Sequence, residues 1–277
     1  MATITFRGVR GSYPVADPRM AGYGGNTTCV QVDTGRERVY IDAGSGMMPL
    51  DAAKDRDMHH VFLTHYHWDH IMGLPYFGPL YAAGQRVTLY GERKPCAREN
   101  GMAGPRDALL KQLGAPYFPL DVPNIKAKLE ERVIAPYEAV PLDGMTMVAM
   151  RLRHPQQSLG YVAVFDDGTR AAFVWDHEYG DREIDDTLEQ MVRGADVLVM
   201  DATYTVPEYD SGRKGWGHCT NVYAATLAAR AGVGKLVLTH HDPRHTDGDI
   251  DEMVWEAQKI FRNTTGAREG VVMSVRR

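Results

Sequence analysis

The sequence predicts an α/β fold in which mixed β-sheets are covered by helices. Short β-branched runs recur along the whole chain, and helical patterns lie mainly in its second half. Of the 277 residues, 44% are hydrophobic, which is enough to bury a large core. A length-based rule suggests nearly two domains, but α/β folds of this size often form one, so we expect a single domain over residues 1–277.

The expected elements can be placed along the chain. Strands are predicted at residues 28–32, 38–41, 60–63, 86–89, 160–165, 171–175, 196–200 and 235–238. Residues 166–169 contain a glycine and join two of these strands as a hairpin. The clearest helix spans residues 249–261, where apolar side chains recur from Ile250 to Phe261 at helical spacing.

Polar residues repeatedly follow the predicted strands. Two apolar strands end in Thr-His, at His65 and His240. This weak internal repeat would be explained by a sandwich built from two similar halves. Three other strands end in an aspartate, at Asp42, Asp176 and Asp201. Because ligands of layered α/β folds bind beyond strand ends, these residues indicate where a site forms.

Residues 94–132 read as an inserted arm with one short helix. Four prolines interrupt the segment, at Pro105, Pro116, Pro119 and Pro123. Its Ala-Pro-Tyr-Phe-Pro run at 115–119 is compatible with a lid, a dimer contact or local packing, and exposed aromatic runs favour local packing.

Charge and cysteine content limit the choice of partner and compartment. The net charge of −5 lacks the basic excess of a dedicated nucleic-acid binder, so we do not expect a large nucleic acid as partner. No signal sequence or membrane span is visible. The three cysteines are widely spaced and odd in number, which favours reduced thiols and a cytoplasmic protein.

The strongest chemical signal is His65-Tyr66-His67-Trp68-Asp69-His70, directly after an apolar strand. An extended strand end points alternate side chains to one side, so His65 and His67 can share one metal ion. A turn after them brings Asp69 and His70 toward a second. Imidazole and carboxylate ligands suit Zn²⁺, Mn²⁺ or iron, with zinc as the first choice.

This motif resembles the signature of the metallo-β-lactamase superfamily, His-x-His-x-Asp-His after an apolar strand. The likeness continues in Phe-Arg-Gly-Val-Arg-Gly-Ser at 6–12, Tyr-Gly-Gly-Asn-Thr at 23–27 and Ile-Asp-Ala-Gly at 41–44, which look like the branch containing ribonuclease Z and small phosphodiesterases. The resemblance implies a four-layer αββα sandwich with two mixed β-sheets.

The resemblance also implies that seven side chains hold two divalent ions. They are His65, His67 and His154 at one ion, Asp69, His70 and His240 at the other, and Asp176 as a bridge. His241 is a rival for the last ligand. Related sequences often have a small residue where this chain has His177, so the role of His177 stays open.

Asp69 and His218 are the residues that we expect to be catalytic. The Gly-His-Cys-Thr element around His218 is similar to the Gly-His-Ser-Thr element of ribonuclease Z, which implies that His218 assists departure of the leaving oxygen. The alternative for His218 is a structural or helix-capping role. His241, Arg244 and His245 are weaker candidates for substrate contacts, since charged loop residues are usually only solvated.

The expected function is metal-dependent hydrolysis of a small phosphodiester, possibly a cyclic nucleotide, by a metal-bridged hydroxide. Two alternatives stay open. One is a lactam, lactone or thioester hydrolase using the same dinuclear site. The other is a di-iron redox protein or a non-catalytic metal-binding sensor. The resemblance is also compatible with a homodimer, and Asp42 is expected to orient a ligand histidine.

Overall fold

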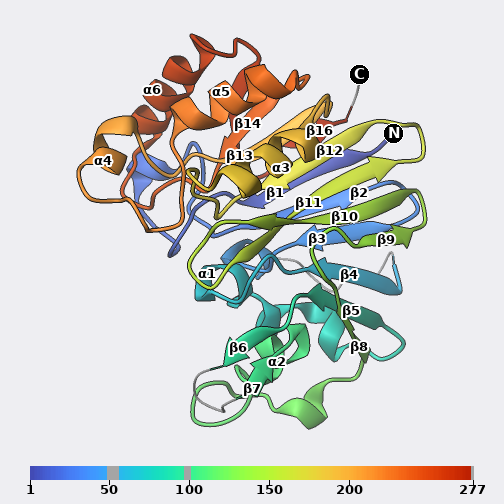
Figure 1. Cartoon of the computed structure of the whole chain (residues 1–277). Helices are drawn as coiled ribbons and strands as arrows, with labels where there is room; N and C mark the ends of the chain where they lie inside the picture. Colours follow the sequence, from blue (N-terminus) through green and yellow to red (C-terminus); the bar gives the residue numbers. More distant parts are fainter. Residues whose placement is uncertain (49–55, 97–100, 276–277) are drawn as a thin grey trace.

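The computed structural model describes residues 1–48, 56–96 and 101–275, which form two large β-sheets packed face to face (Figure 1). The first sheet contains, in spatial order, β16 (Val272–Ser274), β1 (Thr3–Gly8), β2 (Cys29–Asp33), β3 (Arg38–Ile41), β4 (Met58–Phe62), β5 (Arg86–Gly91) and β8 (Lys128–Val133). The second contains β15 (Thr264–Gly266), β14 (Leu236–Thr239), β13 (Val197–Asp201), β12 (Arg170–Val174), β11 (Ser158–Phe165), β10 (Met145–Leu152) and β9 (Ala139–Leu142). Both sheets are mixed, because each has antiparallel pairs on one side and parallel pairs on the other.

Helices and a small hairpin complete the described chain. The helices are α1 (Trp68–Ile71), α2 (Pro105–Leu110), α3 (Arg182–Val192), α4 (Val206–Asp210), α5 (Asn221–Ala231) and α6 (Asp247–Gln258). Single 3-10 turns lie at Pro18–Met20, Ser45–Met47, Leu74–Tyr76, Gly78–Tyr81 and Val122–Asn124. The hairpin pairs β6 (Lys94–Cys96) with β7 (Gly101–Ala103). None of the helices within the described ranges is long and apolar enough to span a membrane.

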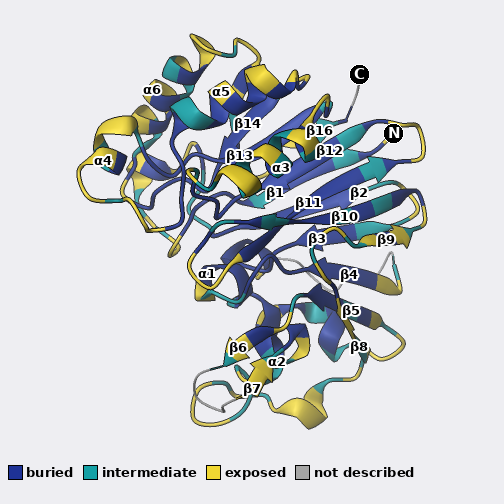
Figure 2. Ribbon diagram, in the orientation of Figure 1, coloured by how far each residue is buried: buried dark blue, intermediate teal, exposed yellow. Residues whose placement is uncertain are grey.

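Three buried apolar clusters separate four layers of structure. One lies between the sheets, one between the second sheet and helices α3, α5 and α6, and one between the first sheet and α1, α2 and the nearby turns. Strand β13 shows the alternation, since Val199 faces the other sheet while Leu198 and Met200 face helices. The central strands of both sheets are accordingly among the most buried parts of the ribbon (Figure 2). The predicted four-layer αββα sandwich is confirmed.

The predicted elements occur close to their expected positions, and the differences have local causes. Each of the eight predicted strands is present, and the hairpin β11–β12 turns at residues 166–169. Helix α6 begins two residues early, because Thr246 and Asp249 form a reciprocal capping box. Strand β10 was not predicted, because both of its faces are apolar and its methionines give neither alternation nor β-branching.

The segment 94–132 differs from the expected arm at its end. The hairpin β6–β7 projects beyond the first sheet (Figure 1), whereas α2 packs against this sheet, and from Lys128 the chain is strand β8, paired in parallel with β5. Phe118 packs on Tyr76 with ring centroids 5.3 Å apart, whereas Tyr117 is 90% exposed. Local packing, the favoured interpretation, therefore accounts for one ring of the aromatic run, and a lid or a dimer contact stays an untested alternative. The single-domain organisation also stays a prediction.

A hydrogen bond from Tyr161 ties the two sheets together beneath the histidine motif. Tyr161 lies on β11 and is fully buried, and its hydroxyl donates to the Leu63 carbonyl at 2.7 Å. The Leu159 amide of the same strand donates to the Thr64 carbonyl at 3.0 Å. The backbone that leads into His65 is thus held by the opposite sheet.

Tyr161→Phe should lower the free energy of unfolding by about 1–2 kcal/mol, because it leaves the buried Leu63 carbonyl without its donor. Urea denaturation monitored by circular dichroism measures this change. Tyr117→Phe, at an exposed ring, is the matched control and should be neutral. Equal stability of the two variants would show that the bond between the sheets contributes nothing.

Candidate metal centre

Three strand ends place polar side chains at one point of the sandwich. Asp42 follows β3, Asp176 follows β12, and His240 follows β14. All three residues have a left-handed backbone, with φ of 58°, 56° and 58°. Non-glycine residues adopt this conformation at a cost, and such residues cluster at functional sites. The turns direct these side chains into the same buried centre.

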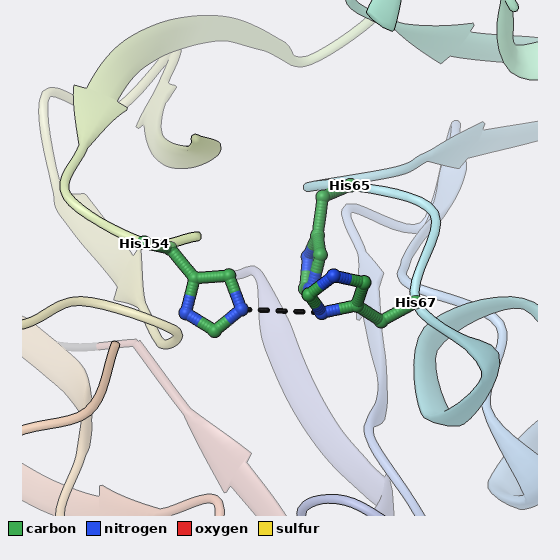
Figure 3. Close-up of side chains that lie close together, drawn as sticks. All are labelled: His65, His67 and His154. Carbon is green, nitrogen blue, oxygen red and sulfur yellow. Dashed lines mark hydrogen bonds between the residues drawn. The ribbon is translucent and has the colours of Figure 1, made fainter. Parts of the chain in front are cut away.

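The histidine motif reaches this centre through the end of β4 and the start of α1. His65 follows the strand, His67 caps α1, and the helix carries Asp69 and His70. His154, from the loop after β10, points toward His65 and His67 from the opposite side (Figure 3). Its Nε2 lies 3.2 Å from His67 Nδ1. These three histidines face a common point.

The carboxylate of Asp176 lies between two groups of ligands. Its Oδ1 is 3.4 Å from His154 Nε2 and 3.9 Å from His65 Nε2. Its Oδ2 is 3.1 Å from both His70 Nε2 and His240 Nε2. One oxygen therefore faces each group, which is the geometry that a bridging carboxylate requires.

The second group is completed by Asp69. Its Oδ2 lies 3.2 Å from His70 Nε2 and 3.7 Å from His240 Nε2. The backbone amide of Ser12 donates to the same oxygen at 2.7 Å. The N-terminal loop thus helps to orient a predicted ligand.

The donor atoms fit divalent metal ions. His65, His67 and His154 place one ligand atom each within 4.8 Å of one another, and so do Asp69, His70 and His240. The buried atoms His65 Nε2, His70 Nε2, His240 Nε2 and Asp176 Oδ2 have no hydrogen-bond partner. Buried polar atoms are normally paired, and a bound cation would give these four atoms a partner. Further triplets of the described residues include His218, which lies at the edge of the cluster.

The electrostatics of the centre also favour bound cations. Burial would raise the pKa of the Asp176 carboxyl, but the surrounding imidazoles, His240 and His70 above all, hold it well below its usual range. Burial would lower the pKa of His240, but carboxylates, Asp176 first, raise it to about 9. His154, which has fewer carboxylates near it, has a pKa lowered by burial to about 4. The buried carboxylates therefore remain charged and attract positive charge.

The second ring nitrogen of each predicted ligand histidine has its own partner. These contacts join His65 Nδ1 to Thr64 Oγ1, His67 Nε2 to Gln156 Oε1, His70 Nδ1 to Asp42 Oδ2, His154 Nδ1 to the Gly217 carbonyl and His240 Nδ1 to Thr203 Oγ1. Such contacts fix the tautomer and direct the other nitrogen at a metal. The expected role of Asp42 agrees with this placement.

His218 has a carboxylate partner that the sequence did not assign to it. Its Nδ1 lies 3.0 Å from Asp201 Oδ2, and Asp201 is fully buried. Asp201 was recognised only as an acid at a strand end. The pairing depends on the contact of the segment around Cys219 with the end of β13 and the loop after it, and no local pattern near residue 218 indicates it.

Three weaker candidates lie outside the cluster of ligands. His241 Nε2 contacts the Ala267 carbonyl at 3.2 Å, so His240 joins the centre and His241 does not. His245 Nε2 contacts Glu208 Oε1 at 2.9 Å. Arg244 forms a bidentate ion pair with Asp242, in which Nε donates to Oδ1 at 2.8 Å and Nη2 donates to Oδ2 at 2.6 Å.

His177 is also directed away from the cluster. Its Nε2 lies 3.3 Å from Asp185 Oδ1, and its Nδ1 accepts from the Arg153 amide at 3.3 Å. This histidine therefore ties the strand end to α3. Its neighbour Asp176 is the residue that enters the centre.

Comparison with known proteins identifies relatives over almost the whole chain. The family described as a beta-lactamase superfamily domain matches residues 37–241. Ribonuclease Z of Archaeoglobus fulgidus is 27% identical over 320 aligned residues, covering 98% of this chain and 97% of the relative. Among solved structures, the metallo-beta-lactamase fold protein YhfI from Bacillus subtilis is 20% identical, with a TM-score of 0.72 and 98% of both chains covered. The short form of human tRNase Z is 22% identical, with a TM-score of 0.69 and coverage of 99% and 100%.

These relatives correct one expectation. The acidic composition predicted that a large nucleic acid would not be a partner, but full-length relatives are ribonucleases. The expectation was wrong because the net charge is a sum over the whole protein. It does not give the charge at the one surface where a nucleic acid would bind.

Sequence and fold lead to the same conclusion. The family match spans most of the chain, and the four-layer sandwich agrees with that of the structural neighbours. The chain therefore belongs to the beta-lactamase superfamily, as a hydrolase with the metallo-β-lactamase fold.

Proposed function

We propose that this chain hydrolyses phosphodiesters with two divalent metal ions, zinc being the first choice. The observation that carries the proposal is the Asp176 carboxylate, which turns one oxygen toward each group of predicted ligands. His65, His67 and His154 would hold one ion, and Asp69, His70 and His240 the other. The sequence relatives named ribonuclease Z support a phosphodiester as the bond that is cleaved.

The metal ions and the protein have separate tasks. When bound, divalent ions lower the pKa of water and neutralise negative charge on phosphoryl oxygens. In the overall reaction, a water oxygen forms a bond to phosphorus and releases a proton to solvent, the bond from phosphorus to the leaving oxygen breaks, and the leaving oxygen takes a proton. We assign this proton to His218, whose contact with Asp201 through Nδ1 leaves Nε2 as the donor. The contact with the Asp201 carboxylate holds the His218 ring in position.

The substrate enters beside the first group of histidines. A cavity of about 720 Å³ is lined by His65, His67, Tyr66, Lys94 and Gln156. A small phosphodiester such as a cyclic nucleotide has a size suited to this cavity, and the end of an RNA chain presents the same bond. We therefore propose both small phosphodiesters and RNA ends as substrates. We also propose that the chain forms a homodimer, as the resemblance suggests.

Hydrolysis assays with phosphodiesters, a β-lactam and a lactone test the proposal. We expect metal-loaded protein to hydrolyse bis(p-nitrophenyl) phosphate and to turn over cyclic nucleotides or RNA, but not nitrocefin or a lactone. Hydrolysis of nitrocefin or the lactone in place of phosphodiesters would assign the site to carbonyl substrates. Bound iron with consumption of a thiol persulfide and no ester hydrolysis would assign it to redox chemistry.

His218→Ala should lower kcat about 10²- to 10⁴-fold for a dinucleotide, whose leaving alkoxide needs a proton. The loss should be much smaller for bis(p-nitrophenyl) phosphate, because p-nitrophenolate leaves without one. Steady-state kinetics with both substrates measure the difference, and elemental analysis verifies that metal content is unchanged. An equal loss for both leaving groups would assign His218 a structural role and remove it from proton transfer.

Asp42→Asn should weaken metal binding about 10- to 100-fold, because Asp42 Oδ2 orients His70 and also accepts from the Trp175 indole at 2.7 Å. Competition with a chromophoric chelator measures the affinity. Asp186→Asn, at a side chain that is 57% exposed, is the matched control. Equal affinity of both variants would show that the carboxylate does not support the metal centre.

A further inference from the structure

A second cavity is lined by His218. It has a volume of about 300 Å³ and is formed by the N-terminal loop, the loop after α4 and the loop after His240. Its lining includes Ser12, Tyr204, Arg213, Trp216, His218 and Arg244. Ser12 also contacts the predicted ligand Asp69. The cavity therefore adjoins the centre at the residue that we assign to the leaving oxygen.

Arg213 brings positive charge to this cavity. Its guanidinium carbon lies 4.6 Å from the Trp216 ring centroid and 5.9 Å from that of Tyr204. Within the described part of the chain, no carboxylate forms an ion pair with Arg213. The neighbouring Arg244 is neutralised by Asp242. Arg213 is thus the cation that an anionic ligand in this cavity would meet.

Trp216 supplies an aromatic surface beside that charge. The residue is 54% exposed, although it immediately precedes the buried segment that contains His218. An indole that is stacked with a guanidinium and open at the mouth of a cavity can accept a nucleobase, because every base has a π-face. The cavity therefore combines a site for a flat ring with a site for an anion.

We propose that this cavity binds the leaving nucleotide of the substrate, with its base on Trp216 and a further phosphate on Arg213. The proposal rests on phosphodiester hydrolysis at the metal centre and specifies its substrate class. The favoured substrates are linear phosphodiesters whose leaving nucleoside carries a second phosphate. A dinucleotide with a terminal phosphate and an RNA chain both have this chemistry.

Kinetics with related dinucleotides test the proposal. The substrates are uridylyl-uridine and its two derivatives with a 5′- or 3′-terminal phosphate, and product analysis identifies the leaving nucleoside. A phosphate on that nucleoside should lower KM about tenfold in the wild type. In Arg213→Gln this gain should fall below about twofold, and Arg213→Lys should restore part of it. An unchanged gain in Arg213→Gln would overturn the proposal.

The aromatic contact has its own variant and control. Trp216→Leu should raise KM about tenfold for all the dinucleotides, with kcat nearly unchanged, because a stacking contact is lost. Trp255→Leu is the matched control, since Trp255 is also exposed and has Lys259 Nζ 3.3 Å above its ring. Arg182→Gln, at a side chain that is 95% exposed, is the control for charge. Equal effects of the two tryptophan variants would remove Trp216 from the site.

Hydrolysis of bis(p-nitrophenyl) phosphate and the binding of a nucleotide separate this proposal from the proposed function. An RNA oligonucleotide then distinguishes RNA from small dinucleotides as the substrate. If the wild type does not hydrolyse bis(p-nitrophenyl) phosphate, the proposed function is wrong. Binding of a nucleotide in the cavity is then tested by equilibrium dialysis with uridine 3′,5′-bisphosphate. The wild type should bind this nucleotide about tenfold more tightly than Arg213→Gln does. Equal binding would overturn the proposal independently of activity. A larger Arg213→Gln effect on the oligonucleotide than on the dinucleotides would assign the site to RNA.

Discussion

The buried negative charge of Asp176 is the constraint on which the rest of the centre depends. A carboxylate that is 2% exposed costs several kcal/mol unless opposite charge compensates it. No lysine or arginine of the described residues contacts it, and histidines approach both of its oxygens. Imidazole nitrogens can either carry protons or bind metal, so the arrangement suits a centre that is completed by cations.

The sandwich explains why this charge can be placed so deeply. The histidine motif follows a strand of the first sheet, whereas Asp176 and His240 follow strands of the second. The ligands therefore meet where the ends of the two sheets adjoin, and neither sheet could form the centre alone. The Tyr161 bond between the sheets and the left-handed strand ends hold the donor atoms in position. Rigid supports of this kind limit reorganisation during the reaction.

Local patterns made the α/β class and one half of the centre predictable, whereas the four-layer arrangement was predicted from the resemblance to a family. His65, His67, Asp69 and His70 lie within six residues, so their convergence follows from the strand end and the turn alone. His154, Asp176 and His240 could be named only through the resemblance to a family, because strand pairing far along the chain brings them together. The Asp201–His218 pair and the contact of Gln156 with His67 were missed for the same reason. Arg213 and Trp216 are close in sequence, but their loop is irregular, with left-handed glycines at 212, 215 and 217.

The central claim is that seven side chains surround a pair of metal ions with Asp176 between them. Anomalous diffraction from crystals of metal-loaded protein tests it most directly, because the signal locates each metal independently of the fold. The account predicts two peaks about 3.5–4 Å apart, one beside His65, His67 and His154 and the other beside Asp69, His70 and His240. A single peak, or peaks away from Asp176, would contradict it.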